Sequence, residues 1–170
     1  MGRVFGFAGH PPSCDNSTQI FMPDKSNNVF TIGFTKKTAA AFFESLRNAG
    51  VRRLIDVRLN NVSQLAGFSK KEDLRYFLKE ILHIDYIHEP LLAPTKEMRA
   101  SYQATKSWPD YQRDFVALMK ERRIEDKIDP DLVRGSCLLC SENQPHRCHR
   151  RLAAEYLQNK WGGIAIKHLV

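Results

Sequence analysis

Short apolar runs alternate with segments whose apolar residues recur at helical spacing. The runs favour strands at residues 29–34, 53–58, 85–88, 136–140 and 163–169. The spacing between them predicts helices after Thr35 or Thr38, from Ser69 onward, and at residues 95–106, 109–123 and about 148–159. Strands that alternate with helices predict one α/β domain whose mostly parallel sheet is flanked by helices, a Rossmann-like layering.

Two helices carry sharper expectations. Ala39, Phe42, Phe43 and Leu46 share one face of the first helix, which ends at the turn of residues 48–50. Ser69 and Glu72 have the spacing of a capping box at the start of the second helix. Its expected core face consists of Leu74, Phe77, Leu78 and Ile81.

The chain divides into an irregular arm and a folded domain. Residues 1–28 are rich in Pro, Gly, Ser and Asn with little periodicity, and residues 29–170 hold the predicted elements. The hydrophobic content of 42% and the charged content of 26% are ordinary for a globular protein. With no apolar run of membrane-spanning length and no signal peptide, we expect a cytoplasmic protein that does not bind membranes.

The chain is basic, with a formal net charge of +7. A basic balance favours phosphate-bearing partners, such as nucleic acid or a phosphorylated small molecule. A solvated basic surface would give the same count. The placement favours binding, because His146, Arg147, His149, Arg150 and Arg151 crowd into one turn.

Most of these residues lie in the cysteine loop, residues 140–150, which joins a strand end to a helix start. Cys148 lies at the helix N-terminus, where the helix dipole and neighbouring cations lower a thiol pKa and favour a bound anion. Cys140, at the strand exit, can share a pocket with it. Arg147 and Arg150 can grip phosphate or carboxylate in two-pronged fashion, and Glu142 can orient water or pair with arginine.

A second loop is expected to reach the same place. Ligands of open α/β sheets lie beyond the carboxyl ends of the strands, where the loop after Asp56 also begins. Asp56 and Arg58 project to one face, as a structural ion pair or as a base with an anion-binding arginine. Asn60 and Ser63 can add hydrogen bonds. We expect acid, thiol and guanidinium groups to face a common cavity.

A zinc site is an alternative interpretation of the cysteines. Cys137, Cys140, Cys148 and His149 offer enough ligands for a tetrahedral site. Residues three apart on a strand face opposite sides, however, so Cys137 and Cys140 are poorly placed to share an ion. We therefore expect no metal or other cofactor, and we expect Cys137 to belong to the core.

The motifs resemble those of the DUF488 family over about residues 29–157. The resemblance is carried by the segments at residues 31–35, 54–58 and 91–96, and by the Cys-x-Glu and Cys-His-Arg patterns of the cysteine loop. The chain looks like a subgroup with Asp-Val-Arg-Leu-Asn-Asn, in which Phe34 and Asn61 replace the His and Pro of many relatives. The resemblance implies site residues Asp56, Arg58, Ser63, Cys140, Glu142, Cys148, His149 and Arg150.

Three functions fit these patterns. The first expectation is an enzyme that hydrolyses or modifies a base in nucleic acid or a nucleotide, in the manner of a DNA glycosylase, with Asp56 or Glu142 at the reaction centre. Tyr86, Tyr102, Trp108 and Tyr111 could stack on the base or belong to the core. The second is sulfur or phosphoryl transfer by Cys140 or Cys148, as in rhodaneses and phosphatases. The third is a non-catalytic nucleic-acid-binding module, with or without a structural zinc.

Overall fold

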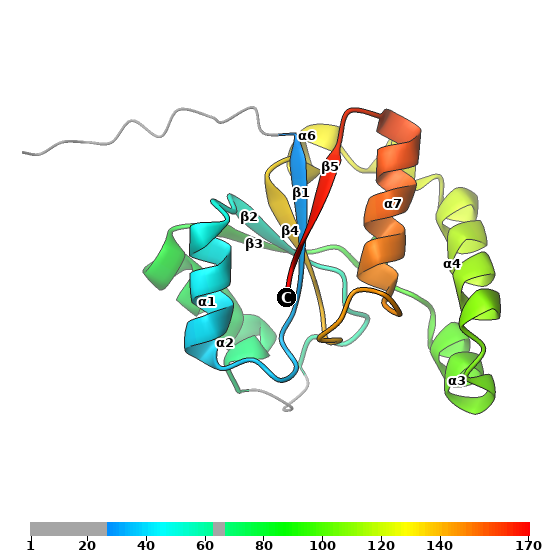
Figure 1. The fold of residues 1–170 in the computed structure, drawn as a ribbon, viewed down its shortest axis with the longest axis horizontal. Helices are drawn as coiled ribbons and strands as arrows, with labels where there is room; N and C mark the ends of the chain where they lie inside the picture. Colours follow the sequence, from blue (N-terminus) through cyan, green and yellow to red (C-terminus); the bar gives the residue numbers. More distant parts are fainter. Residues whose placement is uncertain (1–26, 63–66) are drawn as a thin grey trace, which may run out of the picture.

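The computed structural model describes residues 27–62 and 67–170. Five parallel strands form one sheet in the order β3-β2-β4-β1-β5 (Figure 1). The strands are β1 (Asn28–Gly33), β2 (Arg53–Asp56), β3 (Asp85–His88), β4 (Ser136–Cys140) and β5 (Ala165–Leu169). The α/β class and the flanked parallel sheet are confirmed, and the sheet is parallel throughout.

Helices cover both faces of the sheet (Figure 1). They are α1 (Ala39–Asn48), α2 (Lys71–Phe77), α3 (Lys96–Thr105), α4 (Trp108–Arg122), α5 (Ile124–Lys127), α6 (Pro130–Val133) and α7 (His149–Trp161). Short helical turns lie at η1 (Gly67–Ser69), η2 (Leu78–Leu82) and η3 (Pro90–Leu92). Within the described ranges, no helix is both long and apolar enough to cross a bilayer.

Strand alternation divides the core into two halves. Phe30, Leu54 and Leu139 face α1 and α2, whose Phe42 and Leu74 complete that half of the core. Val29, Ile55, Val57 and Leu138 face the other way, toward α4 and α7. The core face expected for α1 is confirmed, and Thr38 caps this helix by accepting a hydrogen bond from the backbone N–H of Ala41.

The predicted start of α2 was wrong. Ser69 ends the turn η1, and Lys70 stands at the N-cap with no side-chain cap. Ser69 is fully buried, and its carbonyl accepts a hydrogen bond from Arg58. The predicted core position of Ile81 was also wrong, because the helix widens into the π-turn η2 at Leu78 and rotates Ile81 to 42% exposure.

The topology places a crevice at the end of β4. Both neighbours of β4 lead into helices of the α1/α2 face, whereas β4 leads into α7 on the opposite face. Chain connections that diverge in this way leave the carboxyl end of the strand uncovered, which is where open α/β sheets bind their ligands. The cysteine loop begins at this point.

Candidate functional site

A cavity of about 440 Å³ opens beyond the carboxyl ends of β1, β2 and β4. From the strand ends it is lined by Phe34, Arg58, Leu59 and Asn60. From the cysteine loop it is lined by Cys140, Ser141, Glu142, Arg147, Cys148 and His149. The third wall comes from the segment around α3 and α4, with Pro94, Arg99, Tyr102, Gln103, Lys106, Trp108 and Tyr111. The two loops singled out in the sequence therefore meet in one cavity.

Cys140 and His149 form the centre of one wall. The Sγ atom of Cys140 lies 3.5 Å from Nδ1 of His149. Nε2 of the same ring donates a hydrogen bond of 2.9 Å to the carbonyl of Val57, the residue that follows β2. Because that bond fixes the proton on Nε2, Nδ1 is free to accept a proton from the Cys140 thiol. The ring also packs on Phe115 of α4.

Cys148 completes a cluster of three. The sulfur atoms of Cys140 and Cys148 and a ring nitrogen of His149 lie within 4.8 Å of one another. The hydrogen bond from the Cys148 thiol and the nearby His149, opposed by burial, lower the pKa of Cys140 well below its ordinary value. Burial, together with the bond to Cys140, raises the pKa of Cys148. Although burial alone would lower the pKa of His149, the Cys140 thiolate raises it.

The charge around this cluster is positive. Arg58, Arg99, Lys106 and Arg147 line the cavity, and among the described lining residues Glu142 is the one carboxylate. Arg58 is 3% exposed, and its Nη1 is buried without a hydrogen-bond partner. A buried donor without a partner is costly, which sets Nη1 apart from Nε and Nη2 of the same guanidinium, both of which donate to Asp56.

Two sulfurs and one ring nitrogen are a set that can hold Zn²⁺. The bond from His149 to Val57 would also suit a metal ligand, because it orients the ring. The neighbouring charges oppose a cation, however, since Arg150 donates to the Cys148 sulfur at 3.4 Å and four more cations line the cavity. This environment favours a bound anion.

Asp56 lies outside the cavity lining, contrary to expectation. It is fully buried and pairs in register with Leu139, so it faces α1 and α2, whereas Cys140 faces α7. Its carboxylate accepts two hydrogen bonds from the Arg58 guanidinium, at 2.8 and 2.6 Å, and one of 2.7 Å from the Tyr86 hydroxyl. Asp56 therefore orients Arg58, which is the structural ion pair of the two expected alternatives.

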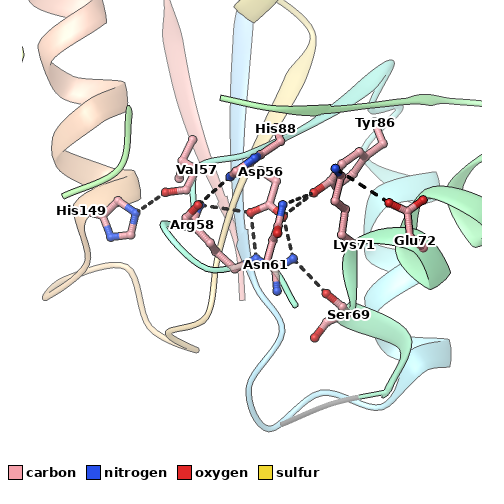
Figure 2. Close-up of polar contacts among 10 residues, drawn as sticks. All are labelled: Asp56, Val57, Arg58, Asn61, Ser69, Lys71, Glu72, Tyr86, His88 and His149. Atoms are coloured by element: carbon pink, nitrogen blue, oxygen red, sulfur yellow. Dashed lines mark hydrogen bonds and ion pairs between the residues drawn. The ribbon is translucent and has the colours of Figure 1, made fainter. Parts of the chain in front are cut away.

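Figure 2 shows the network that holds this strand end together. Asn61 donates to the Tyr86 hydroxyl, and His88 donates to the carbonyl of Arg58. On the other side of the strand end, His149 reaches the carbonyl of Val57. The Asp56 side chain and the backbone carbonyls of Val57 and Arg58 thus connect the end of β2 to β3 and α7. Tyr86, considered as a stacking residue, belongs to this network instead.

Arg150 also differs from expectation, because it lies outside the cavity lining and is fully buried. Its guanidinium donates to the carbonyls of Glu142 and Asn143 and to the sulfur of Cys148. These bonds run from α7 back across the cysteine loop. Arg150 is therefore an anchor of the loop, and its charge acts on the cavity through Cys148.

The remaining predicted site residues differ in whether they line the cavity. Asn60, Glu142 and Arg147 line the cavity, whereas His146 is exposed outside the lining. Ser63 lies outside the described residues, as does the predicted arm up to residue 26. Cys137 is fully buried in the α1/α2 half of the core, as expected, and burial raises its pKa.

Sequence reasoning missed the contribution of α3. Arg99, Gln103 and Lys106 line the cavity together with Tyr102. Their positions follow the helical spacing that places side chains on one face, and that face carries charge and amide groups rather than an apolar stripe. The spacing was the available signal, but nothing in it indicated that α3 and the cysteine loop would line the same cavity.

Comparison with models of protein families identifies the family of this chain. The family model described as "Domain of unknown function DUF488" matches residues 38–157, which include β2, β4, the cysteine loop and most of α7. No curated protein and no solved structure matches the chain. The matched range covers most of the sequence and most of the cavity lining. The chain therefore belongs to the DUF488 family.

Proposed function

We propose that this protein is a cysteine-dependent enzyme that acts on an anionic substrate bound in the cavity. Cys140 is the nucleophile, and the group that it removes from the substrate is carried on its sulfur. The observation that supports this proposal most is the contact of 3.5 Å between the Cys140 sulfur and Nδ1 of His149 in the wall of a cationic cavity. A thiol beside an oriented base is the usual arrangement of an activated cysteine.

His149 is the base of this proposal. Its Nε2 proton is held by the Val57 carbonyl, so the thiol proton passes to Nδ1 and leaves a thiolate beside an imidazolium. Both groups are nearly buried, with Cys140 at 4% and His149 at 9% exposure. Charges of opposite sign stabilise each other more strongly where water is scarce. The pair is thus suited to hold a nucleophilic thiolate at neutral pH.

The substrate is expected to carry at least one negative charge. Four cationic side chains line the cavity, and the arginines among them can donate hydrogen bonds to oxygen atoms of the ligand. Cys140 lies at the end of β4, on the N-terminal side of α7. The helix dipole favours negative charge at that end of a helix. A reducing compartment such as the cytoplasm would keep its thiol available.

A second candidate function is hydrolysis at a base, which was the first expectation from the sequence. Tyr102 and Trp108 line the cavity, so hydrolysis at the base of a nucleotide or nucleic acid would have an aromatic wall for stacking. Asp56 is poorly placed for this chemistry, because its oxygens are occupied by Arg58 and Tyr86. Glu142 would have to position the water. This candidate predicts that Glu142→Gln abolishes turnover and that Cys140→Ser leaves a substantial part of it.

The thiolate proposal is tested by limited alkylation of the native protein with iodoacetamide, followed by peptide mass spectrometry. Of the three cysteines that the structure describes, Cys140 should be labelled first. His149→Asn should lower the alkylation rate of Cys140 at neutral pH about tenfold or more, because it removes the base that accepts the thiol proton. Cys137, which is buried in the core, serves as the internal control and should stay unlabelled until the protein unfolds. Labelling of Cys140 only on unfolding, or a rate unaffected by His149→Asn, would contradict the proposal.

A further inference from the structure

The proposed mechanism uses Cys140 as its nucleophile and assigns no role to Cys148, the second thiol of the cavity. Cys148 lines the same cavity as Cys140, is 2% exposed, and has its sulfur within 4.8 Å of the Cys140 sulfur. It is also the N-cap residue of α7. Its sulfur lies beside the Cys140 sulfur and accepts a hydrogen bond from the Arg150 guanidinium.

We propose that Cys148 is the resolving thiol of the reaction and that the substrate is an anionic donor of sulfane sulfur. This inference rests on the proposed function, with Cys140 as nucleophile. Cys148 attacks the Cys140 sulfur once that sulfur carries a transferred atom. The transferred atom leaves, and the two cysteines are joined in a disulfide. The two sulfurs lie within 4.8 Å of one another, and the disulfide would join two residues of the same cysteine loop.

The chemistry balances with thiosulfate as the simplest donor. The Cys140 thiolate attacks the outer sulfur of thiosulfate, the S–S bond of the donor breaks, and sulfite leaves with the electron pair. Cys140 then carries a persulfide. The Cys148 thiol gives up its proton and attacks the Cys140 sulfur, so the persulfide bond breaks and hydrosulfide leaves with that proton. The transferred sulfur is reduced, the two thiols are oxidised to a disulfide, and an external dithiol must restore them by exchange.

Phosphoryl transfer does not use a second thiol in this way. In a cysteinyl phosphate the electrophilic atom is phosphorus, and attack on the sulfur would expel phosphorus with an electron pair. Water would resolve that intermediate instead. A thiol within reach of the nucleophilic sulfur therefore favours a sulfur cargo over a phosphoryl cargo. The cationic lining fits as well, because it stabilises both the donor anion and the sulfite that leaves.

The pattern of hydrogen bonds keeps the two sulfurs distinct. Arg150 donates to Cys148, whereas His149 faces Cys140. Each sulfur thus has its own cationic neighbour, and the base that activates the nucleophile stays beside it. Cys137 is three residues from Cys140 but lies on the opposite face of the sheet, in the core. It provides a matched thiol that cannot take part.

The test mixes the full chain, reduced and freed of metal by chelation, with thiosulfate and no added thiol. The wild type should release one sulfite and one hydrosulfide per chain, and peptide mapping should find a Cys140–Cys148 disulfide. Cys148→Ser should release sulfite alone and retain one sulfur atom on Cys140. Cys137→Ser should behave as the wild type, and Cys140→Ser should release neither product.

The outcomes separate this inference from the proposed function. Hydrosulfide release by Cys148→Ser at the wild-type level, or sulfite release by the wild type with no disulfide, overturns the resolving role and leaves the Cys140 nucleophile standing. Alkylation of Cys140 without any sulfite release overturns the sulfane donor alone. Absence of both alkylation and sulfite release removes the proposed function. Circular dichroism of each variant shows that it is folded, and tightly held zinc that blocks both reactions would overturn the thiol assignment.

Discussion

Replacing Gly33 with alanine places a methyl group in the path of the cysteine loop. Gly33 ends β1 and pairs in register with Cys140. A Cβ at this position would lie 1.7 Å from the carbonyl oxygen of Glu142 and 2.6 Å from its carbon. Both atoms belong to backbone, so they cannot swing aside as a side chain would. The loop must move by roughly 1 Å or more to relieve the overlap.

The cost follows from what the loop loses. Overpacking of this kind costs about 1–3 kcal/mol. Arg150 donates a hydrogen bond to the same Glu142 carbonyl, and leaving a buried partner unpaired costs about 1–3 kcal/mol more. Gly33→Ala should therefore destabilise the fold by roughly 2–6 kcal/mol in urea denaturation. Because Cys140 is the register partner, its alkylation rate should fall as well.

Gly67→Ala is the matched control for this substitution. A Cβ built at Gly67 has no heavy atom within 4 Å, and neither glycine has a positive backbone φ. The same chemical change should therefore cost little at Gly67. If Gly33→Ala and Gly67→Ala show equal stability and equal Cys140 alkylation rates, the close approach of the cysteine loop to β1 is wrong.

Three further predictions test separate parts of the molecule. Tyr86→Phe removes one donor to Asp56 and should cost about 1–3 kcal/mol in urea denaturation, with the Cys140 alkylation rate unchanged, since neither residue lines the cavity. Arg99→Gln should lower the rate of Cys140 alkylation by anionic iodoacetate about two- to fivefold while the rate with neutral iodoacetamide stays constant, and added salt should shrink the difference. Hydrogen bonds from Lys160 and Tyr156 lower the pKa of Glu125 to about 2, so its contribution is present above pH 4.5 and is lost as the pH falls toward 2. In acid denaturation, Glu125→Gln should be less stable than the wild type at neutral pH and should approach it over that range.

The fold could be predicted because the hydrophobic patterns of the individual strands and helices agree with their layering in the folded domain. Alternation of strands and helices indicated a flanked parallel sheet, and buried runs such as residues 136–140 became central strands. Errors arose where the backbone departs from regular geometry. Ser69 matched a capping box, but the turn η1 places it in the interior, where its carbonyl serves Arg58. A π-turn likewise moved Ile81 off the core face.

The site could be predicted in part for a similar reason. Strand ends identified the place, and the cysteine loop supplied Cys140, Cys148 and His149. The direction of Asp56 depends on which face of the sheet each alternate residue of β2 occupies, and the sequence pattern left that choice open. Arg150 became a loop anchor through carbonyl contacts that only the folded loop creates.

The central claim is that Cys140 is a thiolate facing the cavity and held by His149. The most direct measurement is a pH titration of thiolate ultraviolet absorbance in the folded protein, compared with Cys140→Ser and Cys148→Ser. We predict one thiol that ionises well below the ordinary pKa of about 8.5, absent in Cys140→Ser and retained in Cys148→Ser, whose hydroxyl can still donate to the thiolate. A titration in which every thiol ionises at or above that value, or in which Cys140→Ser leaves the low-pH step in place, would contradict it.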